Sequence, residues 1–314
     1  MNRSVLTVAL NPSVDKTVTV DRLAPYGLNR VQQSEIDPGG KGINVARVLQ
    51  SFGDDVTVTG FLSGHTGKFL FDCIQQDKIK TGFLEIPGET RTNIKIFDQT
   101  VKKTTEINEQ GNYIAPEELE LFQKKFLCLL PTVRVVVISG SLPPGVPLDF
   151  YAELTELAEK SGAKVILDAD GEALQKGIDS RPFAVKPNIH ELTALIGKPL
   201  KTEKDVLEAG RNLLEKGIRL VVVSLGADGA IALDPSGAFK ADVWKITVKS
   251  ATGAGDSMVG ALADAVLCGM SLEEITRAAT AAGTVTASKP GTQLCTGPEV
   301  KKALPLVTLH RIKF

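Results

Sequence analysis

Residues 133–138 read Val133-Arg134-Val135-Val136-Val137-Ile138 and are apolar almost throughout. Successive side chains of a β-strand point to opposite faces, so a run without polar alternation predicts a strand that is buried on both sides. Parallel sheets that are covered by helices contain such strands. The run therefore predicts the interior of an α/β sheet.

Other segments of the chain extend this pattern. Helices with an apolar stripe are expected between the strands: Val45, Val48, Leu49 and Phe52 follow the i, i+3, i+4, i+7 spacing, and Gly53 supplies the stop. This alternation predicts an α/β fold with a mainly parallel sheet and helices on both sides. The expected strands are Ser4–Leu10, Asp55–Phe61, Arg134–Ser139, Lys164–Asp168, Arg219–Ser224 and Ile246–Val248.

Two stretches interrupt the alternation. Residues 12–36 are mixed polar and β-branched, and residues 90–108 alternate in character before a turn near Asp98. They predict a small separate sheet, which would cover a cleft as a discontinuous β lid. The main α/β domain, which would bind nucleotide and substrate, is then expected to comprise residues 1–11, 37–89 and 109–314.

Composition excludes several classes of protein. Among 314 residues, 43 % are hydrophobic and 23 % charged, which is typical of a globular chain. The net charge of −1 provides no overall basic field for nucleic acid or an anionic membrane, and no stretch approaches the ~18 apolar residues of a membrane helix. Four scattered cysteines and three unclustered histidines predict a cytoplasmic protein without zinc or haem.

The first glycine-rich motif is Thr252-Gly253-Ala254-Gly255-Asp256, placed after the expected strand Ile246–Val248 and at the start of a helix. Backbone amides at such a turn can bind an anion, and the helix N-terminus adds partial positive charge. A carboxylate beside this site would repel the anion unless it accepts a proton from an attacking hydroxyl. The alternative is that Asp256 caps the helix and the glycines form a turn.

The second glycine-rich motif, Pro38-Gly39-Gly40-Lys41-Gly42-Ile43-Asn44, also lies at a helix start. Its glycines allow close approach of a substrate, Asn44 can bond sugar hydroxyls, and Lys41 can meet a phosphate. A flexible turn with a solvated lysine is the alternative.

The third motif is Lys186-Pro187-Asn188-Ile189-His190-Glu191. Asn188 and Glu191 have the spacing of a capping box. Alternatively, their oxygens lie near a magnesium–phosphate complex and contact it through water.

Four other segments are weaker candidates. Asp15 follows the first expected strand, where it either meets ligand or lies in an exposed turn, and Arg91 in the lid either binds phosphate or is solvated. Residues 224–230 either bend around a nucleotide or form a hairpin turn. Residues 139–145 contain no G-x-S-x-G elbow, so hydrolase chemistry is unsupported.

Taken together, these motifs resemble those of the PfkB-type, ribokinase-like carbohydrate kinases, in the same order over nearly the full length. The resemblance implies a three-layer α/β/α fold with a β-sheet lid, ATP and Mg²⁺ as cofactors, and a homodimer formed through the lids. It implies Asp256 as the base and Gly253, Ala254 and Gly255 as an anion hole. It assigns the substrate to Asp15, Gly39, Gly40, Lys41, Asn44, Arg91, Asn93 and Ser139. It assigns the nucleotide to Lys186, Asn188, Ser224, Gly226, Gly229, Ser250 and Thr252, and the metal to Asn188 and Glu191, through water.

Within the family, the sequence is similar to the phosphosugar branch, which includes 1-phosphofructokinase and tagatose-6-phosphate kinase. The segment Thr90-Arg91-Thr92-Asn93-Ile94-Lys95 is closer to the former, so the resemblance implies phosphorylation of fructose 1-phosphate to fructose 1,6-bisphosphate. Tagatose 6-phosphate and then fructose 6-phosphate are the alternative substrates. A non-catalytic sugar-phosphate sensor is an alternative of another class. Ser250-Ala251 stands where many family members carry an acidic residue.

Overall fold

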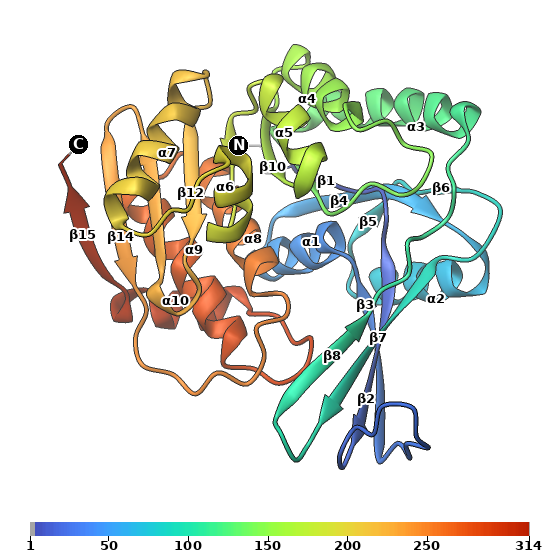
Figure 1. Cartoon of the computed structure of the whole chain (residues 1–314). Coiled ribbons are helices and arrows are strands. Elements are labelled where there is room, and N and C mark those ends of the chain that lie inside the picture. Colours follow the sequence, from blue (N-terminus) through green and yellow to red (C-terminus); the bar gives the residue numbers. More distant parts are fainter. Residues whose placement is uncertain (1–3, 314) are drawn as a thin grey trace.

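The computed structural model describes residues 4–313, which form a large sheet between two helical layers and a small sheet at one side (Figure 1). The strands of the large sheet are, in spatial order, β15 (Thr308–Ile312), β14 (Gly237–Asp242), β13 (Ala230–Asp234), β12 (Leu220–Ser224), β11 (Ala184–Val185), β10 (Lys164–Asp168), β9 (Val135–Ser139), β1 (Ser4–Ala9), β4 (Asp55–Leu62) and β5 (Lys80–Thr81), with β6 (Leu84–Glu85) also paired to β4.

The large sheet is parallel from β12 through β5, and β13 to β15 are antiparallel. The predicted α/β class with a mainly parallel sheet is confirmed, and five of the six expected strands are present to within one residue at each end. Strand β9 shows why: Val135 and Val137 pack into the core on one face of the sheet, and Val136 and Ile138 pack into the core on the other.

Helices cover both faces of the large sheet. One layer, on the side of Val136, contains α3 (Pro116–Leu129), α4 (Phe150–Lys160), α5 (Gly171–Asp179), α6 (Ile189–Ile196) and α7 (Glu203–Glu215). The other contains α1 (Lys41–Phe52), α2 (Gly64–Gln76), α8 (Ala254–Leu267) and α9 (Leu272–Ala287), and α10 (Gly297–Ala303) packs against α1 and α9. Short 3₁₀ turns occupy Leu130–Thr132, Gly226–Asp228 and Leu304–Leu306.

The expected strand Ile246–Val248 is wrong: residues 243–250 have no regular structure. The position beside β12 is taken by β13, which returns antiparallel from the preceding turn. Val248 is 61 % exposed, and the amides of Lys249 and Ser250 bond the carbonyl oxygen of Ala287 at the end of α9. The first glycine-rich motif therefore follows an irregular segment, although it does open helix α8.

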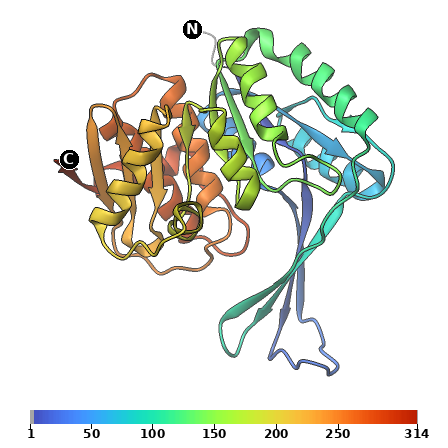
Figure 2. The same cartoon turned by 45° about the horizontal axis from the view of Figure 1, so that its top comes forward.

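The small sheet projects from the main body (Figures 1 and 2). Its strands are β3 (Gln33–Gly39), β2 (Ser13–Val20), β7 (Arg91–Asp98) and β8 (Lys103–Ile107), in that order. The central pair β2–β7 is parallel and the outer pairs are antiparallel. Strand β3 leads directly into helix α1, so this sheet adjoins the second glycine-rich motif.

Among residues 4–313, no helix is long and apolar enough to cross a membrane.

Candidate active site

Five of the predicted substrate-binding residues lie where the small sheet meets the carboxyl ends of the parallel strands: Gly40, Lys41, Arg91, Asn93 and Ser139. A cavity of about 170 Å³ opens there. Ligands of open α/β sheets bind at this edge. The cavity is lined by Ala9, Asn11, Gly40, Lys41, Arg91, Asn93, Asn108, Ser139, Gly140, Ser141 and Asp170.

Asp256 lies in the first turn of α8 and is 8 % exposed. The expected alternative, a capping aspartate, is wrong: the N-cap position is Gly253, with φ of 76°, and it makes no side-chain cap. Instead, Oδ2 of Asp256 accepts a hydrogen bond of 2.7 Å from Nδ2 of Asn44 on α1. The two glycine-rich motifs therefore meet through these two side chains.

Backbone donors surround this carboxylate at the start of α8. The amides of Gly253 and Gly255 donate to no backbone carbonyl within residues 4–313, whereas that of Ala254 donates to the Ala251 oxygen at 3.3 Å. The first amides of a helix lack intrahelical partners and attract anions. Two of the three amides predicted to form an anion hole can therefore donate to a bound anion. The third, that of Ala254, would first have to break its long hydrogen bond to Ala251.

A second carboxylate, Asp168, is buried beside this turn. It ends β10, pairs with the Lys186 ammonium at 3.2 Å, and accepts a hydrogen bond of 3.0 Å from the Ser139 hydroxyl. Burial alone would raise the pKa of Asp168, but Lys186, Lys41 and Ser139 outweigh burial and lower that pKa. Asp168 is therefore a permanent negative charge at neutral pH.

Burial, followed by the Asp168 charge, raises the pKa of Asp256 to about 6. The Asn44 amide and the ammonium groups of Lys41 and Lys186 act in the opposite direction. Asp256 is consequently ionised at neutral pH, and its pKa is close enough to the working pH for it to act as a general base.

Lys41, the first residue of α1, is partly buried near acidic groups and lines the cavity. Asp168 and, more weakly, Asp256 hold the pKa of Lys41 above its usual value, against the effect of burial. The alternative of a flexible turn with a solvated lysine is wrong. Lys41 is a fixed positive charge between the cavity and the two carboxylates.

The small sheet contributes a second polar cluster around Asp15. Oδ2 of Asp15 pairs with the Lys95 ammonium at 2.6 Å, and Oδ1 accepts bonds from Ser13 and Asn93 at 3.0 and 3.2 Å. The alternative of an exposed turn is wrong, because Asp15 is 7 % exposed and lies within β2. Gly39 on β3 is required here, since a Cβ would lie 2.6 Å from the Asp15 carboxyl.

Two further residues of the small sheet line the cavity. Within residues 4–313, Oδ1 of Asn93 is buried without a hydrogen-bond partner, so it is able to accept a hydrogen bond. Arg91 is not solvated: its guanidinium donates to the carbonyl oxygens of Asn11 and Glu109 at 2.8 and 2.9 Å, and burial lowers its pKa. It presents its charge to the cavity from a fixed position.

The residues assigned to the nucleotide lie on the neighbouring strand ends. Ser224 ends β12 and bridges to Asn188. The hairpin interpretation of residues 224–230 is confirmed by the turn into β13, and a Cβ on Gly229 would lie 1.8 Å from the Ala241 oxygen. The Lys186 ammonium forms an ion pair with Asp168. The Ser250 hydroxyl accepts a hydrogen bond of 3.2 Å from the Thr252 amide.

The capping box of α6 is confirmed. Oδ1 of Asn188 accepts from the amides of His190 and Glu191, and Oε2 of Glu191 accepts from the Asn188 amide. No group of three potential metal-ligating side chains occurs within the described residues. The remaining oxygen of Glu191 makes no hydrogen bond in residues 4–313, so this donor set fits an outer, water-mediated contact to Mg²⁺.

Sequence reasoning missed several residues of this site. Asp168 carried a signal, because it ends an expected buried strand at the ligand-binding edge of the sheet. Lys95 carried a weaker one, as a polar residue in an alternating strand. Asn11, Asn108, Ser141 and Asp170 reach the cavity from loops, where no periodicity marks them.

The comparisons with known proteins agree with this geometry. The chain is 35 % identical over 308 residues to 1-phosphofructokinase of Bacillus subtilis (strain 168), covering 98 % of this chain and all of that protein. Among solved structures, phosphofructokinase-2 from Escherichia coli matches with a TM-score of 0.92 and 32 % identity, covering 97 % of this chain and 99 % of that one. A possible 1-phosphofructokinase from Thermotoga maritima matches with a TM-score of 0.90 and 29 % identity, covering 99 % and 100 %. The model of the pfkB family of carbohydrate kinases matches residues 8–299, and the chain belongs to this family.

Proposed function

We propose that the protein transfers the γ-phosphoryl group of ATP to the free primary hydroxyl of fructose 1-phosphate, giving fructose 1,6-bisphosphate and ADP. The observation that carries this proposal is the buried Asp256, with its pKa near 6, at the amides that open α8. Its neighbour Lys41 and the fixed Arg91 give the adjoining cavity two positive charges, which suit the substrate's existing phosphate.

In this reaction, Asp256 accepts the proton of the attacking hydroxyl while the oxygen bonds to the γ-phosphorus and ADP leaves. The amides of Gly253, Ala254 and Gly255 stabilise the charge that develops on the transferred group. Asp15 and Asn93 orient the sugar from the small sheet. When bound, Mg²⁺ neutralises charge on the ATP phosphates, and Asn188 and Glu191 would hold it through water.

The test is release of ADP in the presence of Mg-ATP with fructose 1-phosphate, tagatose 6-phosphate, fructose 6-phosphate or fructose. We expect the highest kcat/KM with fructose 1-phosphate. A preference for tagatose 6-phosphate would retain the reaction and replace the substrate. Tight binding of a sugar phosphate without turnover would instead identify a sensor.

We also propose that the protein is a homodimer formed through the small sheet and that it is cytoplasmic. Ile36 and Ile107 are 53 % and 54 % exposed, and strand register places them in one row with Ile94, on the face opposite Asp15. Covering this row would bury apolar surface, and in the described part of the chain no strand pairs with the outer edges of β3 and β8. The thiols of Cys73, Cys128 and Cys295 are free, which suits a reducing compartment.

Sedimentation analysis tests the dimer. We expect the wild type to sediment as a dimer and Ile107→Glu as a monomer, because a charge at this position would be buried unpaired in the interface. Thr104→Glu, on the opposite face of β8, is the matched control and should stay dimeric. A dimeric Ile107→Glu variant would place the interface elsewhere.

A further inference from the structure

The loop between α9 and α10, residues 288–296, contacts strand β3 of the small sheet. The Thr292 hydroxyl donates a hydrogen bond of 2.6 Å to Oδ2 of Asp37 on β3. In the same region, a Cβ on Gly291 would lie 3.7 Å from the carboxylate of Glu35, two residues earlier on that strand. The loop therefore docks against the strand that leads into Gly39, Gly40 and Lys41.

The same loop covers the anion-binding turn at its other end. The side chain of Leu294 packs onto Gly253, because a Cβ on that glycine would lie 2.6 Å from Cδ2 of Leu294. The Cys295 amide donates to the Thr286 hydroxyl at 2.9 Å, and that hydroxyl donates to Ser257 at 2.7 Å. Ser257 follows Asp256 directly, so the loop is tied to the first turn of α8.

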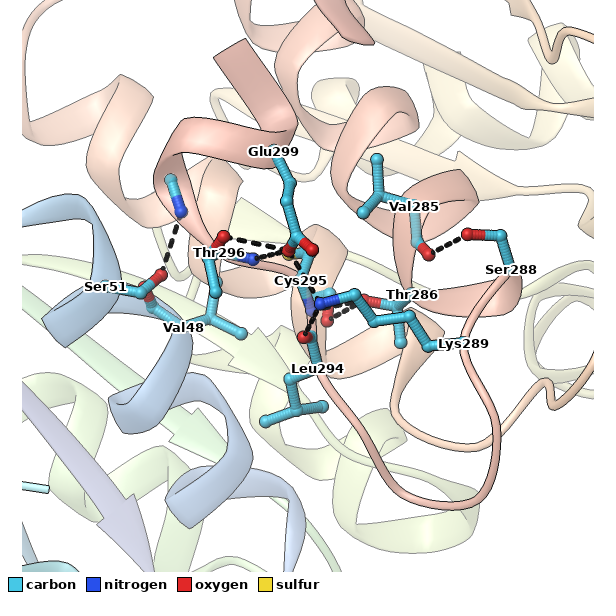
Figure 3. Close-up of polar contacts among 12 residues, drawn as sticks. Val48, Ser51, Val285, Thr286, Ser288, Lys289, Leu294, Cys295, Thr296 and Glu299 are labelled. Carbon is cyan, nitrogen blue, oxygen red and sulfur yellow. Dashed lines mark hydrogen bonds and ion pairs between the residues drawn. The ribbon is translucent and has the colours of Figure 1, made fainter. Parts of the chain in front are cut away.

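Hydrogen bonds and an ion pair of Lys289 join the start of the loop to its end (Figure 3). The Lys289 ammonium donates to the Leu294 oxygen at 2.9 Å and pairs with Glu299 on α10 at 2.6 Å. The hydrogen bond between Lys289 and Leu294 closes the segment 289–294, which contains Thr292. Because the loop contacts both β3 and the start of α8, it links the position of β3 to that of Gly253.

We propose that Thr292 is a positioning residue for phosphoryl transfer. Its bond to Asp37 holds β3, and with it the sugar phosphate bound at the small sheet, in register with the anion-binding turn that Leu294 covers. A reacting oxygen and phosphorus must be aligned closely, so a loosened register lowers the rate of transfer more than it lowers binding. This inference rests on the proposed function and adds a residue outside those that the resemblance assigns to the substrate and the nucleotide.

The test compares Thr292→Val, which keeps the shape and loses the hydroxyl, with Thr292→Ser, which keeps the hydroxyl. A hydrogen bond to a charged acceptor is strong enough that its loss should lower kcat about tenfold. We expect Thr292→Val to show this loss with the KM for ATP unchanged, and Thr292→Ser to restore kcat. Thr308→Val, at an exposed threonine of edge strand β15, is the matched control and should behave as wild type.

Hydrogen exchange gives a second readout that needs no turnover. We expect faster exchange of the β3 amides and of the Cys295 amide in Thr292→Val than in wild type or Thr292→Ser. Unchanged kcat and exchange in Thr292→Val would overturn the proposal, as would a Thr292→Ser variant that is equally impaired. If the wild type phosphorylates no ketohexose phosphate, the proposed function fails, and exchange alone still decides whether Thr292 links the two regions.

Discussion

Two buried lysine–carboxylate pairs lie near the cavity, one in each sheet, and they differ in what surrounds them. Lys95 and Asp15 belong to adjacent strands of the small sheet, and the other partners of Asp15 are Ser13 and Asn93 of the same sheet. Asp168 ends β10 and Lys186 directly follows β11, so this pair lies at the carboxyl ends of interior strands of the large sheet. Lys41 from α1 and Ser139 from β9 also act on Asp168. Asp168 and Lys186 are both among the charges that shift the pKa of Asp256, in opposite directions, whereas Asp15 and Lys95 are not.

This difference separates two tasks. The pair in the small sheet is a self-contained polar unit that can orient a substrate and move with its sheet. The pair in the large sheet acts at a distance on the base, because charges in a buried region are weakly screened. Changes to the first should therefore alter binding, and changes to the second should alter the pH dependence of the rate.

The largest effect is expected for Asp256→Asn. Without the base, kcat should fall about 10³-fold, while ATP binding, measured by calorimetry, should persist. Near-normal turnover would contradict the role of Asp256.

The same variant should be more stable than wild type at pH 8. The pKa of Asp256 rises from 3.8 to about 6 on folding, so the folded state binds this proton more tightly than the unfolded state does. The ionised carboxylate therefore costs stability above pH 6, by about 3 kcal/mol, and this cost declines as the pH falls towards 4. Thermal unfolding of both proteins at pH 8 and pH 5 measures the difference, which should be larger at pH 8.

A smaller effect on the rate is expected for Asp168→Asn than for Asp256→Asn. Wild-type kcat/KM should fall as the pH drops through about 6, because Asp256 becomes protonated. Removing the Asp168 charge should move this limb to lower pH. It should also destabilise the fold by about 3–5 kcal/mol, since Lys186 stays buried without its partner.

Asp170→Asn is the matched control for that experiment, because Asp170 lines the cavity but is not among the charges that shift the pKa of Asp256. Its acid limb should stay at pH 6. An unmoved limb in Asp168→Asn would mean that the Asp168 charge does not set the pKa of Asp256.

Much of the fold could be predicted because the central strands are apolar on both faces, as in β9. The two glycine-rich motifs also predicted the starts of helices α1 and α8. The strand expected at Ile246–Val248 is absent because β-branched residues do not show whether a neighbouring strand is free to pair. The position beside β12 is occupied by β13. The capping box at Asn188 and the hairpin before β13 are local features, and each was one of two interpretations that the sequence allowed.

The partners of the site residues were harder to predict. Asn44 and Asp256 are 212 residues apart, and Asp15 and Lys95 are 80 apart, so their bonds depend on how distant segments of the chain pack together. Motifs gave the residue types at each strand end. They did not show that Asn44 would hold the base, or that Asp168 would set its acidity.

The smallest effect is expected for Lys95→Met, which sharpens the comparison from the other side. Methionine fills similar space, and Asp15 keeps its bonds to Ser13 and Asn93, so the small sheet should fold. Leaving Asp15 buried without its cation should destabilise the fold by about 3–5 kcal/mol, as in Asp168→Asn, so the effect that is smallest here is that on kcat. Because Asp15 loses the cation that fixes it, the KM for the sugar phosphate should rise about tenfold, with kcat within a few-fold of wild type. Lys103→Met, at an exposed position on β8, is the control. The acid limb should stay near pH 6 in both variants. A shifted limb in Lys95→Met would mean that the pair in the small sheet also reaches the base, and the two tasks would no longer be separate.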